Sequence, residues 1–105
     1  MMEVQNIELQ ISKITAFCQQ WQITEFALFG SVLRDDFRPD SDIDVLVTFS
    51  PEAHHTLFDL VHMENELKEI FQRDVDLVSR RGIERSLNYL RRNEILSLAQ
   101  TIYAA

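Results

Sequence analysis

The sequence of 105 residues predicts an α/β domain with helices packed on a small sheet. Short apolar runs typical of buried strands alternate with segments whose apolar residues recur at helical spacing. Hydrophobic residues make up 46% of the chain, which is enough for one core, and the length is too short for two ordinary domains. No repeat, low-complexity run or linker divides the sequence, so residues 1–105 are expected to form a single domain.

The first half of the chain is expected to hold one helix and two strands. Apolar side chains at helical spacing predict an amphipathic helix over about residues 5–21. Residues 25–30 (EFALFG) predict a short buried strand, and residues 31–36 predict a turn of helix after it. Residues 42–49 (DIDVLVTF) have an apolar centre, which predicts a strand in the interior of the sheet.

The second half is expected to hold further helices and one more strand. Thr56 followed by Asp59 resembles a capping box and begins a helix of about 16 residues. Residues 74–79 (DVDLVS) predict the third strand. Another helix is expected next, then a second helical piece at about residues 94–99 and an extended tail at 100–103. The apolar residues that predict the first of these two helices are Ile83, Leu87 and Leu90.

Charge and composition exclude several classes of protein. The 10 Lys and Arg residues face 17 Asp and Glu, and the resulting net charge of −7 argues against stable nucleic-acid binding. No run reaches the ~18 apolar residues of a membrane span, and the first residues lack the pattern of a signal peptide, so we expect a soluble cytoplasmic protein. The single cysteine, Cys18, cannot form an internal disulfide and is expected to be buried.

Acidic pairs stand at the start of two predicted strands: Asp42 with Asp44, and Asp74 with Asp76. Side chains two residues apart in a strand point to the same face, so the members of each pair lie side by side. Like charges this close repel, and a divalent cation between them relieves the repulsion. Carboxylate oxygens suit Mg²⁺ or Mn²⁺, so the pattern favours a metal site over acids that merely cap strand ends or face solvent.

A calcium loop of the EF-hand type is a specific alternative for this acidic segment. Counted from Asp40, that pattern requires glycine at position 45 and glutamate at position 51. The sequence has Val45 and Pro51, so the alternative is excluded.

Gly30 and Ser31 follow a predicted strand and begin a predicted helical turn. Backbone N–H groups at such a turn suit a phosphate, and glycine lets the backbone approach a ligand closely. A phosphate-binding turn followed by carboxylates on the next two strands makes up the parts of a metal-dependent nucleotidyl-transfer or phosphoryl-transfer site.

The chain resembles the minimal nucleotidyltransferases of the DNA polymerase beta-like superfamily, in particular antitoxins paired with HEPN-domain toxins. The matching residues are Gly30-Ser31, ten intervening residues and Asp42-Ile43-Asp44, within FGSVLRDDFRPDSDIDVLV. The resemblance continues through Val75-Asp76-Leu77-Val78 to Ile102-Tyr103 and covers nearly the whole chain. It implies a small mixed sheet of about three to four strands flanked by helices, with no separate substrate-binding domain.

The resemblance also implies roles for individual residues. Gly30 and Ser31 would contact the phosphates of ATP, while Asp42, Asp44 and Asp76 would be catalytic and hold two Mg²⁺ ions, or Mn²⁺. The choice of Asp76 over Asp74 follows the V-D-L-V pattern of the family. Arg34 matches a family arginine, which would contact phosphate or, as we favour, fix the loop by pairing with a nearby aspartate. Asp35 departs from the family, in which glycine is frequent at this place.

For the reaction, the resemblance implies transfer of AMP from ATP to a tyrosine hydroxyl of a HEPN-domain RNase toxin, which silences the toxin within a hetero-oligomer. Two alternatives stay open: an antitoxin that inhibits its toxin by occlusion alone, and a nucleotidyltransferase acting on a small molecule or an RNA end.

Two sets of residues outside this pattern are expected to lie on the surface. The histidines have no metal-site spacing, and the arginines near the end of the chain suit a solvated or protein-binding helix face at least as well as an RNA surface. They are His54, His55 and His62, and Arg80, Arg81, Arg85, Arg91 and Arg92.

Overall fold

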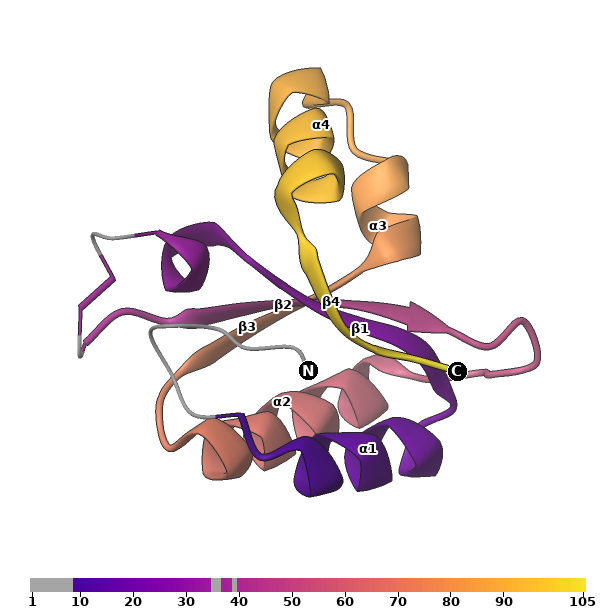
Figure 1. Ribbon diagram of the computed structural model, residues 1–105. Coiled ribbons are helices and arrows are strands. Elements are labelled where there is room, and N and C mark those ends of the chain that lie inside the picture. The colour runs from indigo at the N-terminus through magenta and orange to yellow at the C-terminus, as the bar shows by residue number, and fades with distance from the viewer. Residues whose placement is uncertain (1–8, 35–36, 39) are drawn as a thin grey trace.

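The computed structural model describes residues 9–34, 37–38 and 40–105 (Figure 1). In chain order its elements are α1 (Ile11–Gln20), β1 (Ile23–Phe29), the 3₁₀ turn η1 (Gly30–Leu33), β2 (Ile43–Phe49), α2 (Leu57–Phe71), β3 (Val75–Ser79), α3 (Arg80–Glu84), α4 (Tyr89–Leu98) and β4 (Gln100–Ala104). None of the described helices has the length and apolar character needed to cross a membrane.

The four strands form one mixed sheet in the order β3-β2-β1-β4. β1 runs antiparallel to both β2 and β4, whereas β2 and β3 are parallel and are connected through α2. The predicted fold class is thus confirmed, and the tail expected at 100–103 forms the edge strand β4. The start of the predicted first helix, residues 5–8, lies outside the described residues, as does Asp35.

Helices cover the two faces of the sheet unequally (Figure 1). α1 and α2 pack on one face, where alternate strand residues such as Phe26 and Val45 join Ile14 and Leu67 in the larger of two buried clusters. Cys18 belongs to this cluster, as predicted, and its burial raises the pKa of the thiol to about 12. α3 and α4 cover the other face with a smaller cluster, formed by Ala27, Phe29, Leu46, Ile83 and Ile95.

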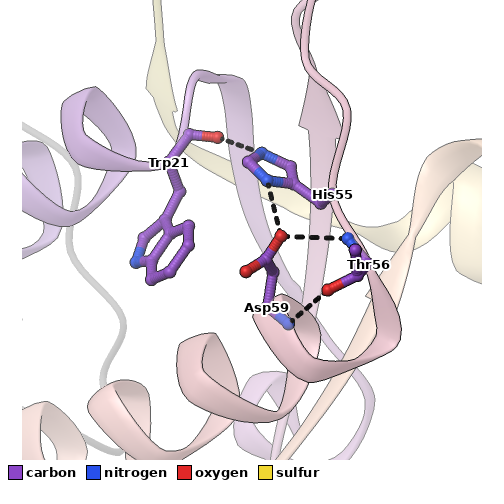
Figure 2. Close-up of polar contacts among 4 residues, drawn as sticks. All are labelled: Trp21, His55, Thr56 and Asp59. Carbon is purple, nitrogen blue, oxygen red and sulfur yellow. Dashed lines mark hydrogen bonds and ion pairs between the residues drawn. The ribbon is translucent and has the colours of Figure 1, made fainter.

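The capping box that the sequence predicts is present at the start of α2, and His55 lies beside it (Figure 2). The Asp59 backbone N–H donates to the Thr56 hydroxyl (3.2 Å), and the Thr56 N–H donates to the Asp59 carboxylate (3.0 Å), which lowers the pKa of Asp59. His55 Nε2 donates to the Trp21 carbonyl (2.7 Å), and its ring packs against Phe49. The prediction of a surface position is therefore wrong for His55, although it holds for His54 and His62.

The prediction for the last two helices is wrong in where the chain breaks. A helix carried from Ile83 through Leu87 to Leu90 does not form, because α3 ends at Glu84 and α4 begins only after Asn88. The Asn88 side chain accepts from the Arg91 N–H (3.1 Å) and so begins the new helix. Leu87 and Leu90 are 89% and 85% exposed, so these two leucines do not face the core even though their spacing is helical.

Candidate active site

Asp44 lies at the centre of the sheet edge where the predicted site residues meet. On β2 it pairs with Phe29 of β1 on one side and with Asp76 of β3 on the other. Its strand neighbours Ile43 and Val45 face the larger cluster, so alternation turns Asp44 to the face that α3 and α4 cover. Asp76 stands in register with Asp44 and shares that face.

Gly30 is the residue whose backbone allows η1 to lie directly on Asp44. Its φ of +77° lies in the left-handed region, which residues other than glycine rarely adopt. A Cβ at this position would overlap Oδ2 of Asp44 and would lie 3.2 Å from its Cγ. Glycine therefore brings the turn and the carboxylate into contact, as expected for a turn that must approach a ligand.

The carboxylates at this edge share one electrostatic environment. Burial raises the pKa of Asp44 above its ordinary value, and the negative charges of Asp76 and Asp42 raise it further, while Arg91 and Arg34 act in the opposite direction. Asp42 precedes β2 and is exposed, as is Asp76, whereas Asp44 is half-buried. A cation beside these three groups would offset the repulsion that Asp44 experiences.

The donor set fits a hard divalent cation, since all three side chains offer carboxylate oxygens. Within the described part of the chain, however, no three His, Cys, Asp or Glu side chains are gathered closely enough to enclose a metal ion. The three aspartates thus lie at one edge and act on one another, without forming a closed cage.

Asp74, the other acid at the start of β3, is placed differently. Its backbone carbonyl accepts from the Ile43 N–H (2.9 Å), and its side chain lines a shallow depression beside Arg73 and Lys68 of the α2 end. It is not among the groups whose charge acts on Asp44. The structure thus separates Asp74 from Asp76, which spacing alone could not do.

A pocket of about 560 Å³ opens beside Gly30, between η1 and α4. Four α4 residues at helical spacing form one wall, and η1 with the ends of β1 and β4 forms the other. The lining residues are Phe29, Gly30, Leu33, Arg34, Arg91, Glu94, Ile95, Leu98 and Gln100. Arg34 follows η1 and lines this pocket, and the Ser31 carbonyl accepts from its backbone N–H (2.9 Å).

No pattern in the sequence distinguishes Arg91 from the other arginines near the end of the chain. The structure separates it from them, because it lines this pocket while Arg92 stacks on Tyr89, 4.6 Å from the ring centre. Arg85 is the C-cap of α3, whereas Arg92 lies in α4. The two arginines therefore do not share a helix face, although the sequence spacing predicted that they would. Only the packing of α4 through Ile95 reveals which arginine faces the site.

Relatives of assigned function resemble the chain over most of its length. The chain is 32% identical over 78 residues to MJ0435 of Methanocaldococcus jannaschii, provisionally named a protein adenylyltransferase; the match covers 74% of this chain and 82% of that protein. It is 30% identical over 66 residues to the protein adenylyltransferase MntA of Thermococcus cleftensis, covering 63% of this chain and 65% of that protein, slightly less than two thirds of its length.

Solved structures share the fold. A structure described provisionally as a minimal nucleotidyltransferase is 31% identical, with a TM-score of 0.66, and the match covers 87% of each chain. A toxin–antitoxin structure with AMP-PNP superposes with a TM-score of 0.70 at 20% identity, over 92% of this chain and 75% of that one. A complex of the tri-AMPylated Shewanella oneidensis HEPN toxin with its MNT antitoxin gives 0.61 at 20% identity, over 90% and 70%.

A family profile gives the assignment itself. The profile described as the nucleotidyltransferase domain matches residues 11–100, which include the Gly30 turn, the carboxylates of β2 and β3 and the wall formed by α4. The resemblance found in the sequence is confirmed, and the chain belongs to the nucleotidyltransferase domain family.

Proposed function

We propose that this chain is a Mg²⁺-dependent antitoxin in the cytoplasm, which transfers AMP from ATP to a tyrosine hydroxyl of a HEPN-domain toxin and thereby silences it. The observation that carries the proposal is the contact of the Gly30 turn with Asp44, with Asp76 in register on the next strand. The names of the relatives support adenylyl transfer, and the toxin–antitoxin complexes among the similar structures support the partner.

The residues divide the work between binding and chemistry. Gly30 and Ser31 would bind the phosphates through the backbone of η1, and Arg34 would add a positive charge at the pocket wall. Asp42, Asp44 and Asp76 would hold two Mg²⁺ ions, which polarise the α-phosphate and favour ionisation of the attacking hydroxyl when bound. Mn²⁺ would serve the same donor set.

The reaction is an in-line displacement at the α-phosphorus. The tyrosine oxygen forms a bond to that phosphorus, the bond to the bridging oxygen of the β-phosphate breaks, and pyrophosphate leaves. The hydroxyl proton passes to solvent, which reaches the exposed Asp76 edge. Because the chain supplies positions and charges without forming a covalent bond to the nucleotide, its main task is to align ATP with the hydroxyl.

The acceptor protein must reach the rim of the pocket, and α4 offers an apolar surface there. Leu90, Glu94 and Leu98 follow one another at four-residue spacing, and the last two line the pocket. Leu90 and Leu98 are exposed although they are large and apolar, which is typical of a protein-binding surface. We place the toxin on this surface, so that its tyrosine enters from the α4 side.

The test uses the full chain, Mg²⁺ and the HEPN-domain protein encoded beside it, with ATP labelled at either the α- or the γ-phosphate. Label from the α-phosphate should appear on the partner, and label from the γ-phosphate should not. Asp44→Asn should reduce transfer by roughly 10²- to 10³-fold or more, because it removes the central carboxylate. Asp74→Asn makes the same change of charge directly before β3, at a residue that does not act on Asp44, and should leave transfer intact.

The other outcomes identify the alternatives. Inhibition of the partner without nucleotide, unaffected by Asp44→Asn, would show that the antitoxin acts by occlusion. Label on a small molecule or an RNA end, in the absence of the partner, would move the reaction to a different acceptor. Equal transfer by Asp44→Asn and the unchanged chain would refute the assigned site.

A further inference from the structure

Arg91 and Arg92 are neighbours on α4, yet their side chains meet different surroundings. Arg92 donates to the Glu84 carbonyl (3.4 Å) and stacks on Tyr89, so its guanidinium fastens α4 to the end of α3. The Arg91 guanidinium makes no hydrogen bond or ion pair with any described residue, and it lines the pocket beside Gly30. Within the described structure, the Arg91 guanidinium is therefore available to a ligand.

Opposite charges border the space between Arg91 and the carboxylates. An anion would be attracted by Arg91, and cations bound to that anion would be attracted by the carboxylates. Arg91 and Asp44 do not form an ion pair, although each lies within the electrostatic range of the other. Gly30 lines the pocket opposite Arg91 and also lies against Asp44, so it connects the pocket with the acidic edge, although none of the three aspartates lines the pocket itself. A polyphosphate placed there would have a guanidinium on one side and the backbone of η1 on the other.

The position of Arg91 is fixed by its backbone rather than by its side chain. The Asn88 cap accepts from the Arg91 N–H, and Ile95, one turn further along α4, is buried against the sheet. The helix therefore presents the Arg91 side chain to the pocket, and no residue in the described part of the chain pairs with its guanidinium. The helix fixes where the Arg91 side chain starts, while ligand binding would have to order the side chain itself.

We infer that Arg91 is a substrate-binding residue that contacts the triphosphate of the nucleotide from the α4 side, opposite the turn formed by Gly30 and Ser31. This inference rests on the proposed function for the identity of the ligand. It adds the C-terminal helix to the nucleotide site, so that the site spans elements from both halves of the chain. Arginine suits this role because its planar fork pairs with phosphate oxygens.

The test is a binding measurement by calorimetry, with Mg²⁺-ATP, tripolyphosphate and adenosine as separate probes. Arg91→Gln should weaken binding of ATP and of tripolyphosphate by about tenfold to a hundredfold, which is typical of the loss of a charged hydrogen bond. Binding of adenosine should not change. Arg91→Lys keeps the charge without the fork and should give an intermediate affinity for ATP.

Arg92→Gln is the matched control, because it removes the same charge from the next residue of the same helix. It should bind ATP as the unchanged chain does, and it should melt at a lower temperature than Arg91→Gln, since among the described residues the Arg92 guanidinium has structural partners and the Arg91 guanidinium has none. Equal weakening of ATP binding by both variants would overturn the inference, because it would report the overall charge alone.

The failure of this inference and the failure of the proposed function are distinct. An Arg91→Gln variant that binds ATP and tripolyphosphate as tightly as the unchanged chain would overturn the inference and leave adenylyl transfer untouched. An unchanged chain that binds ATP through Arg91 but transfers no label would refute the function and leave the inference standing. An unchanged chain that binds no nucleotide would overturn both.

Discussion

The two faces of the sheet differ in how completely their helices cover them. On the α1 and α2 face, Ile14, Phe26, Met63 and Leu67 are fully buried in one continuous cluster. On the α3 and α4 face only five of the described residues form the buried cluster, and α4 leaves Leu90 and Leu98 exposed, the latter at the pocket. The first face holds most of the buried apolar residues described, and the second carries the carboxylates.

This difference shows where a small domain can place a costly site. Asp44 is half-buried among like charges, an arrangement that opposes folding and that a fully packed core would make worse. Apolar burial on the opposite face offsets that cost without sharing residues with the site. The comparison therefore predicts that stability and activity respond to different substitutions.

The largest effect on stability is expected on the packed face. Leu67→Ala removes a fully buried side chain from the centre of the α2 packing and should lower the free energy of unfolding by about 2–5 kcal/mol. Denaturation in urea, followed by circular dichroism, measures it.

Leu90→Ala is the matched change on the other face. Because Leu90 is exposed, the loss should stay within about 0.5 kcal/mol, while binding to the proposed HEPN-domain partner should weaken. Similar destabilisation by both substitutions would show that the α4 face contributes to the core as much as the α2 face does.

A smaller loss of stability is expected from a substitution at Gly30, where η1 contacts Asp44. Gly30→Ala forces a positive φ on alanine and drives its Cβ into the Asp44 carboxylate, so the free energy of unfolding should fall by about 1–3 kcal/mol. Nucleotide binding should fall with it, because η1 and Asp44 must separate. Thermal melts with and without Mg²⁺-ATP report both effects.

Gly82→Ala serves as the control for glycine substitution. Gly82 lies in α3, and its added Cβ would meet only the Ser79 hydroxyl oxygen, at 3.1 Å. Its effect should stay within about 1 kcal/mol, with nucleotide binding unchanged. A Gly30→Ala variant that matched it in both respects would contradict the contact between the turn and the carboxylate.

The smallest expected change in stability comes from removing the charge of Asp44. Its pKa is raised in the folded state, so the folded chain holds the proton more tightly than the unfolded one, and the ionised carboxylate destabilises the fold at neutral pH. Asp44→Asn should therefore raise the melting temperature at neutral pH even though it should reduce the proposed transfer. As the pH falls through the raised pKa towards the ordinary value of 3.8, the carboxylate takes up its proton and the advantage of the variant disappears.

Melting curves of both chains in metal-free buffer, from neutral pH to about pH 4, measure this difference. Asp74→Asn, at an exposed position that does not act on Asp44, should show no comparable gain. A melting temperature that falls for Asp44→Asn at neutral pH would mean that the carboxylate contributes to the fold.

The sequence was informative where one local pattern decides the structure. The apolar centre of residues 43–49 and the pairing of Thr56 with Asp59 were sufficient for β2 and for the start of α2. The spacing of Gly30, Asp42 and Asp44 likewise indicated the candidate site before any contact was known. In each case the residues that determine the feature lie close together in the sequence, at most 14 positions apart (Gly30 to Asp44).

The missed features depend on contacts between distant segments. His55 is only half-exposed because Trp21 and Phe49 contact it, whereas its neighbour His54 is exposed. The break before α4 depends on a single Asn88 cap in a stretch whose leucines suggested one continuous helix. Arg91 differs from Arg92 only after Ile95 has fixed how α4 lies on the sheet.

The pairing of β4 with β1 also has a consequence for the order of assembly. Leu28 pairs with Gln100, so residues made early and late in synthesis become neighbours in the sheet. The strands that carry the carboxylates emerge before α4 and β4, which bring Arg91 and Gln100 to the pocket. A nascent chain would therefore complete the strands of its acidic edge first, and the pocket beside Gly30 would close only when α4 and β4 dock.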